Sequence, residues 1–196
     1  MATEADAALM LRRQLIDGIT RPDRSGRPVR YRFVRLTDDV AAMTDLLHRA
    51  YAPLAAAGMH YVASHQSADV TVQRMAKGDT VVAVITDHVI GTVTLARASE
   101  TSGSPFYDRI DVAHFGQFAV DPEHQRSGIG STLLTLVETL AEERGVRELG
   151  LDTSEHASGL IRLYSAKGYR FVEFSRWSTV NYRSVIMAKT IGTSPE

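Results

Sequence analysis

The chain has no cysteine among its 196 residues. That absence excludes disulfide bonds, metal sites built on thiolates and any mechanism with a cysteine nucleophile. It also fits a reducing compartment, so the sequence predicts a cytoplasmic protein. The formal net charge is only −1, and without an excess of basic residues we expect neither a nucleic acid nor an anionic membrane as a partner.

Long apolar runs are also missing, since no stretch approaches the roughly 20 apolar residues that a membrane-spanning helix needs. The short apolar run at residues 7–10 follows acidic Glu4 and Asp6 and is ended by Arg12, which is not the pattern of a signal peptide. No metal site is expected either, because His60 and His65 are five residues apart and no HExxH motif occurs. The sequence therefore predicts a protein with no membrane partner and no metal.

What is present suffices for one folded domain, and apolar periodicity predicts alternating strands and helices from residue 29 onward. Strands are expected at residues 29–35, 80–86, 89–96, 114–120, 148–151, 169–174 and 184–189. Helices are expected at residues 38–51, 69–77, 131–144 and 158–167. This order predicts an α/β domain over residues 29–196, with a mixed sheet and helices on both faces.

The segment before that domain has a different character. Residues 3–19 are predicted to form a short amphipathic helix, because Leu11, Leu15 and Ile19 recur at helical spacing. Residues 21–28 are rich in Arg, Pro, Gly and Ser, which is typical of a linker. Residues 1–28 are therefore predicted to be an N-terminal helix and a linker.

The most informative motif is a glycine loop, Gln125-Arg126-Ser127-Gly128-Ile129-Gly130, between the strand at 114–120 and the helix at 131–144. Two glycines one residue apart allow a tight turn, and the first-turn N–H groups of a helix lack internal partners. With the helix dipole, this arrangement predicts a site for a phosphate-bearing ligand. A plain strand-to-helix turn is the alternative interpretation.

Several common motifs do not fit this part of the chain. A Walker A loop needs a lysine after its last glycine, and none is present. A dinucleotide-binding fingerprint needs a third small residue where Leu133 stands. The GxSxG motif of serine hydrolases is absent. The loop alone therefore leaves its phosphate ligand unnamed.

The neighbouring residues carry a resemblance to a known family. The strand before the loop ends in Ala119-Val120-Asp121-Pro122, and a later helix carries Leu163-Tyr164 ahead of Gly168-Tyr169. With the Gln125-x-x-Gly128-x-Gly130 pattern and the element order, residues 29–190 resemble the GNAT superfamily of acyl-CoA N-acyltransferases. The resemblance is specific for the fold and the cosubstrate, and it is nearly silent on the acceptor.

The resemblance implies a GNAT fold, in which a mostly antiparallel sheet splays at the CoA site. It implies an acetyltransferase that moves an acetyl group directly from acetyl-CoA to an amine of a small molecule, peptide or protein. It also implies a set of residues for the cosubstrate. The strand would hold pantetheine and the loop would hold the pyrophosphate, through Phe118, Ala119, Val120, Gln125, Arg126, Ser127, Gly128, Ile129, Gly130 and Ser131.

Tyr164 matches the family's usual general acid, which protonates the departing thiolate. Many relatives carry a glutamate base on the strand at 114–120, where this chain has Gln117. His114 is the expected base because histidine titrates in the right range; the carboxylate alternatives are Glu100, Asp111 and Glu155. The missing glutamate also keeps open a CoA-binding regulatory module of the same fold without turnover.

The acceptor is expected to be an amine, and the sequence does not identify it further. The resemblance places His60, Tyr107 and Gln117 on the acceptor side, where aromatic groups can stack on an acceptor or hold its ammonium. Ordinary packing under loops is the alternative. Dimers are common in the family, so a homodimer is a further expectation by analogy.

Overall fold

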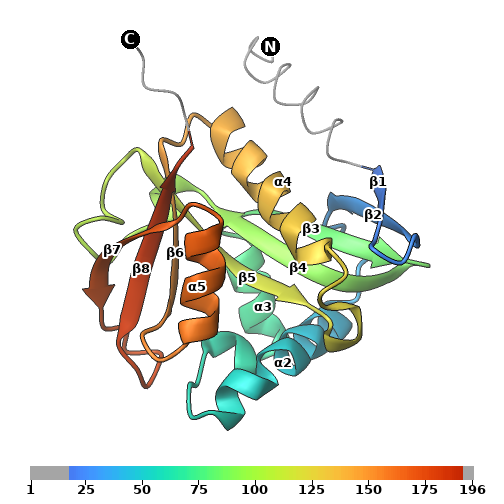
Figure 1. Cartoon of the computed structure of the whole chain (residues 1–196), viewed down its shortest axis with the longest axis horizontal. Coiled ribbons are helices and arrows are strands. Elements are labelled where there is room, and N and C mark those ends of the chain that lie inside the picture. The colour runs from blue at the N-terminus through green and yellow to red at the C-terminus, as the bar shows by residue number, and fades with distance from the viewer. Residues whose placement is uncertain (1–17, 192–196) are drawn as a thin grey trace.

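A computed structural model describes residues 18–191 as one sheet with helices on both faces (Figure 1). The sheet has eight strands in the order β1-β2-β3-β4-β5-β6-β8-β7. Neighbouring strands pair antiparallel, except β5 and β6, which are parallel. This confirms the predicted mixed, mostly antiparallel sheet. The strands are β1 (Ile19–Pro22), β2 (Pro28–Phe33), β3 (Gly78–Ile85), β4 (His88–Ala96), β5 (Val112–Val120), β6 (Glu148–Ser154), β7 (Arg170–Ser175) and β8 (Ser184–Thr190).

The helices of the described part each fall on a predicted helix. They are α2 (Val40–Ala56), α3 (Ala68–Met75), α4 (Ile129–Glu143) and α5 (Ser158–Ala166), with short 3₁₀ turns η1 (Val62–Ser64), η2 (Ala98–Glu100) and η3 (Pro122–His124). In Figure 1, α4 and α5 cover one face of the sheet, and α2 and α3 cover the other. Within residues 18–191, no helix has both the length and the apolar character needed to cross a bilayer.

The burial of α4 fixes the end of the glycine loop in space. Its predicted apolar stripe is buried in the main core, against β3, β4 and β5. Burying one leucine side chain contributes roughly 1.5–3 kcal/mol, so the whole stripe holds the helix firmly. The first turn of α4 therefore keeps a fixed position beside β5. The stripe consists of Leu133, Leu134, Leu136, Val137, Leu140 and Ala141.

The linker prediction for residues 21–28 is wrong, because these residues lie in a hairpin in which all of β1 pairs with the first four residues of β2. The turn is built around Asp23, whose Oδ1 accepts hydrogen bonds from the backbone N–H groups of Ser25 and Arg27. Such side-chain acceptors stabilise tight turns. The sheet thus begins at Ile19, ahead of residue 29, and the remainder of the helix predicted at 3–19 lies outside the described residues.

β5 and β6 stay together for only part of their length. They pair at three positions, the last being His114 opposite Gly150. β5 then continues to Val120 and β6 to Ser154, so the two strands separate beyond that pair. This separation is the splay that the family resemblance implies.

A bulge in β5 lies in the separated part. Thr92 of β4 pairs with Ala119 and Thr94 pairs with Gly116, so β5 has one residue more than β4 between these two pairs. The irregularity includes Gln117, whose φ is +47°, a left-handed conformation that is uncommon for residues other than glycine. Its side chain is 3% exposed, and its Oε1 accepts a hydrogen bond from Gln66 Nε2 at 2.8 Å. We therefore infer that the Gln117 side chain stabilises the bulge.

Candidate active site

A cavity of about 380 Å³ lies beside the separated part of β5. Its walls come from β5, α2, α5, the start of α4, the glycine loop and the β1–β2 turn. Residues that are far apart in the sequence thus line the same cavity. Most residues expected to hold acetyl-CoA line it: Phe118, Ala119, Val120, Gln125, Arg126, Gly128, Gly130 and Ser131.

The glycine loop presents the N-terminus of α4 to this cavity. Gly128 has a φ of +95°, which a residue with a side chain rarely adopts, and α4 begins at the next residue. A Cβ added at Gly130 would come within 3.7 Å of Phe118 and Val120, both of which line the cavity. The unpaired first-turn N–H groups and the positive end of the helix dipole are therefore available to an anion there.

Two residues of the predicted loop set do not line the cavity. The Ser127 hydroxyl donates a hydrogen bond to the His124 carbonyl within the loop. The Ile129 side chain is 1% exposed and belongs to the core. Both side chains shape the loop, and only their backbone N–H groups remain for a ligand.

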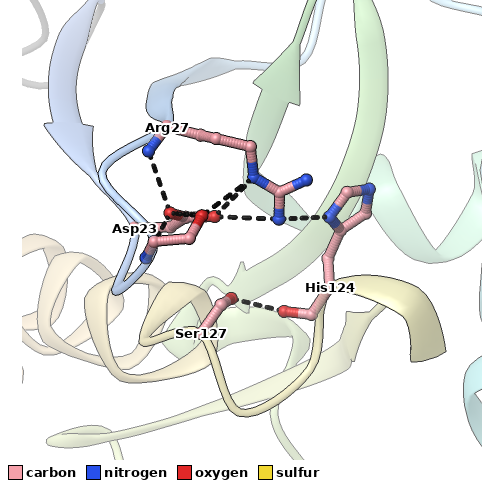
Figure 2. Close-up of polar contacts among 5 residues, drawn as sticks. Asp23, Arg27, His124 and Ser127 are labelled. Carbon is pink, nitrogen blue, oxygen red and sulfur yellow. Dashed lines mark hydrogen bonds and ion pairs between the residues drawn. The ribbon is translucent and has the colours of Figure 1, made fainter.

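The β1–β2 hairpin docks on the glycine loop, and Figure 2 shows Asp23 and Arg27 beside His124 and Ser127. The backbone N–H of Arg24 donates to the Ser127 carbonyl at 2.9 Å, and Arg24 Nη1 donates to the Arg126 carbonyl at 3.2 Å. Arg27 Nη2 lies 3.3 Å from His124 Nδ1. These contacts bring Arg24 to the cavity wall. Sequence reasoning does not find Arg24, because the segment around it has the composition of a linker.

The loop end of the cavity is positively charged. Arg24, Arg126 and Lys167 all line it. Lys167 follows α5, and its Nζ donates to Ser131 Oγ at 3.4 Å. Sequence reasoning missed this lysine, although it lies three residues after Tyr164 and so on the same helical face. Three cations and a helix N-terminus together form a site for a multiply charged anion.

Tyr164 of α5 lines the same cavity and is 7% exposed. Its ring packs edge-on against Phe115 at 6.1 Å and Tyr169 at 5.9 Å, measured between ring centroids. Burial raises the pKa of the Tyr164 hydroxyl well above its usual value of 10.0, so the group keeps its proton at neutral pH. No described residue hydrogen-bonds to the hydroxyl, which is therefore available to a ligand.

His114 lies at the last position where β5 and β6 pair. Its Nδ1 is 2.8 Å from Thr101 Oγ1, and its ring is 5.4 Å from that of Tyr107. Burial, and then the positive charges of Arg74 and Lys77, lower the pKa of His114 to about 4. The imidazole is therefore neutral and weakly basic at neutral pH, which argues against it as a general base.

Asp152 of β6 lies two residues beyond that last pair, in the separated part of the strand. Trp177 Nε1 donates to its Oδ2 at 3.2 Å, and Ser184 Oγ donates to the same atom at 3.1 Å. Its Oδ1 receives no hydrogen bond from the described residues. Burial raises the pKa of this carboxyl above its usual value of 3.8, which makes it a stronger base than an exposed aspartate.

The other carboxylates considered as bases are bound elsewhere or lie apart. Glu155 Oε2 is 2.5 Å from Arg183 Nη2, and Asp111 Oδ2 is 2.7 Å from Arg109 Nη2. These hydrogen bonds lower the pKa of both carboxyls and so weaken them as bases. Glu100 is exposed in η2, outside the separated part of the sheet.

The three residues expected on the acceptor side lie in different surroundings. His60 is exposed and lines a second, open hollow of about 470 Å³ together with Asn181. Tyr107 is 3% exposed, stacks on Trp177 at 6.2 Å and has a buried hydroxyl without a hydrogen-bond partner among the described residues. Gln117 is enclosed in the bulge and lines neither hollow.

Comparison with known proteins agrees with this geometry. A family model described as Acetyltransferase (GNAT) family matches residues 40–169. The chain is 30% identical over 142 residues to S-(2-succino)cysteine N-acetyltransferase of Bacillus subtilis, covering 71% of this chain and 83% of that protein. It is 34% identical over 86 residues to the ribosomal protein bS18-alanine N-acetyltransferase of Escherichia coli, covering 42% of this chain and 58% of that one.

Solved structures share the fold. The ribosomal-protein-S18-alanine N-acetyltransferase from Escherichia coli superposes with a TM-score of 0.64 at 20% identity, over 86% of this chain and 97% of that chain. A GNAT family acetyltransferase from Elizabethkingia anophelis with acetyl-CoA bound gives a TM-score of 0.58 at 16% identity, over 83% and 97% of the two chains. At these identities the structural likeness concerns the fold alone.

Proposed function

This chain belongs to the GNAT family of acetyltransferases, and we propose that it transfers the acetyl group of acetyl-CoA to an amine in the opening between β5 and β6. One observation carries the proposal: a single cavity joins a positively charged helix N-terminus to the free part of β5 and to Tyr164. Those are the three features that a CoA thioester needs, namely a phosphate site, a binding edge and a proton donor.

The phosphate end of acetyl-CoA fits the loop end of the cavity. The first-turn amides of α4 would hold the pyrophosphate, and Arg24, Arg126 and Lys167 would balance its charge. Hydrogen bonds to charged groups contribute about 1.5–3 kcal/mol each, so one such cation alters affinity measurably.

The pantetheine arm fits along β5. The Phe118 carbonyl accepts a hydrogen bond from Tyr51 at 3.2 Å, and the Val120 carbonyl accepts one from Gln125 at 3.1 Å. Both donors line the cavity, so both carbonyls point toward cavity-lining groups. Because β6 does not pair with β5 beyond His114, this edge of β5 would be open to the amides of a pantetheine chain, which would share or replace these two side-chain donors.

The reaction requires three proton movements, because two protons leave the nitrogen and one reaches the sulfur. An amine with a pKa of about 10 is protonated at neutral pH and must lose its first proton before it attacks. The free amine then bonds to the thioester carbon, the nitrogen gives up its second proton as the carbon–sulfur bond breaks, and the sulfur leaves as a thiolate. We assign the donation of a proton to that thiolate to Tyr164, whose raised pKa keeps it protonated.

We assign the removal of the amine proton to Asp152 in place of His114. Asp152 lies in the separated part of β6 with Oδ1 free of hydrogen bonds from the described residues. The raised pKa of Asp152 favours proton acceptance. The pKa of His114, by contrast, is about 4, and the Nδ1 of that histidine contacts Thr101.

Thiol release from acetyl-CoA, measured across a panel of amines, tests this function. We expect release that depends on both the amine and the protein. CoA binding without thiol release for any amine would instead support the regulatory module.

A further inference from the structure

Two residues of opposite charge flank the opening between β5 and β6 without forming an ion pair. Arg74 projects from α3, and its Nη1 donates to Gln66 Oε1 at 2.6 Å. Its Nη2 lies 3.5 Å from the position that a Cβ would take at Gly116, so the guanidinium lies over β5. Asp152 lies on β6. Within residues 18–191, neither Arg74 nor Asp152 has a partner of opposite charge at ion-pair distance.

The strand register places the two charges at the same level. β5 and β6 are parallel, and their last pair is His114 with Gly150. Two residues further along, Gly116 and Asp152 occupy equivalent positions on strands that have begun to separate. Because side chains alternate along a strand, both positions are on the sheet face that α3 covers. A carboxylate and a guanidinium thus stand on opposite sides of the opening.

Burial is unfavourable to both charges. It lowers the pKa of Arg74 and raises that of Asp152, while each charge shifts the pKa of the other in the opposite direction. The strand register places the two groups at the same level of neighbouring strands, yet they are not at ion-pair distance from each other. Arg74 and Asp152 are both half-buried, and charges withdrawn from water are normally paired, so a ligand that carries both complementary charges would complete this arrangement.

Aromatic rings bound the same space. The rings of Tyr61 and Tyr182 are 4.9 Å apart, and those of Tyr51 and Tyr61 are 5.3 Å apart. The Tyr61 hydroxyl is 2.7 Å from Thr153 Oγ1 and accepts a hydrogen bond from the Ser154 N–H at 2.9 Å, which places this ring cluster beside the separated part of β6. Such walls supply apolar contact and hydrogen-bonding groups, and they leave charge recognition to Asp152 and Arg74.

We propose that the acceptor is a zwitterion of the free amino-acid type, with its amine at Asp152 and its carboxylate at Arg74. The inference rests on the proposed function, because Asp152 is also the group that takes the amine proton. A planar guanidinium is well suited to a carboxylate, to which it donates two parallel hydrogen bonds. A peptide N-terminus has no carboxylate next to its amine, so it would leave Arg74 unpaired.

The test compares matched acceptors that differ only in that carboxylate. Thiol release is measured for alanine, glutamate, methionine and phenylalanine, for the carboxamide of each, and for the dipeptide Ala-Ala. We expect kcat/KM to be about 10- to 100-fold higher for a free acid than for its carboxamide, the scale of losing one hydrogen bond between charged groups. Equal values for acids and carboxamides, or a preference for the dipeptide, would overturn the proposal while leaving the acetyltransferase function intact.

Arg74→Gln tests the assignment to this residue. The variant is expected to lose the preference for free acids, while turnover of the carboxamides and affinity for acetyl-CoA change little. Arg97→Gln, at an exposed arginine just after β4, is the control and should keep the preference. A purely structural role for Arg74 would instead lower turnover of both acceptor types equally.

Binding provides a second measurement that does not need turnover. Calorimetric titration of each amino acid and each carboxamide into CoA-saturated protein should show tighter binding of the acids by wild type and not by Arg74→Gln. Equal binding of acids and carboxamides to wild type would overturn the proposal even if no amine were acetylated. Failure to bind CoA itself would instead remove the proposed function.

Discussion

Tyr164 combines a buried position, a raised pKa and a hydroxyl that no described residue occupies. If it protonates the departing thiolate, Tyr164→Phe removes the proton and keeps the ring packed against Phe115. We expect kcat to fall about 100-fold, within the range of general acid catalysis, with acetyl-CoA affinity unchanged. Steady-state kinetics over a range of pH measures this, and full kcat at every pH would remove Tyr164 from the mechanism.

The assignment of the base to Asp152 predicts opposite kinetic effects for substitutions at Asp152 and at His114. Asp152→Asn should lower kcat/KM by about 100-fold, because the amide cannot accept the amine proton. His114→Ala should leave the acid limb of the pH–rate profile in place, because the pKa of this histidine is about 4 and it is neutral throughout the active range. Loss of that limb in His114→Ala, together with an active Asp152→Asn, would reverse the assignment.

Asp152→Asn also has an expected effect on stability. The pKa of this carboxyl is raised on folding, so its charged form opposes folding at pH values above the folded-state pKa. That unfavourable contribution disappears as the pH falls through the pKa and the carboxyl takes up a proton. We therefore expect the variant to unfold at a higher Tm than wild type at neutral pH, with a smaller difference in acid. An equal or lower Tm at neutral pH would contradict this.

At the scale of elements, the β1–β2 hairpin is a part of the site that the sequence pattern conceals. Prolines and a Gly-Arg-rich turn are typical of a linker, yet Asp23 collects the turn's hydrogen bonds and has its pKa lowered to about 2 by them, chiefly by the Ser25 hydroxyl. The hairpin's position on the glycine loop depends on contacts between residues roughly a hundred positions apart, such as Arg24 with Arg126. Local patterns do not encode such contacts.

The hairpin predicts a specific defect in cosubstrate binding. Arg24→Ala should raise the Kd for CoA by about 10-fold and reduce the dependence of binding on salt, because one cation near the phosphates is lost. Arg21→Ala is the matched control, since Arg21 is exposed on the same hairpin and does not line the cavity. Calorimetry with CoA and with 3′-dephospho-CoA tells which phosphate Arg24 meets; an unchanged Kd for both would remove Arg24 from the site.

For the whole molecule, the sequence predicted the sheet class, the helices and most of the cavity wall. The sheet class and the helices follow from apolar periodicity, and the predicted cavity residues follow from the family resemblance that the glycine loop and the strand before it carry. Sequence patterns could not bring Asp152 and Arg74 together. The two residues become neighbours only in the folded sheet, through the register between β5 and β6 under α3. The prediction of His114 as the base rests on the ordinary pKa of histidine, and burial in the folded chain lowers that pKa.

The central claim is that the cavity beside β5 binds acetyl-CoA, and calorimetric titration of acetyl-CoA tests it most directly. Wild type should bind with a stoichiometry of one per chain. Gly130→Leu should abolish binding, because the new side chain points toward Phe118 and Val120 and fills the cavity, while the exposed-site variant Arg97→Gln binds like wild type. No binding by wild type, or equal binding by Gly130→Leu, would contradict the account.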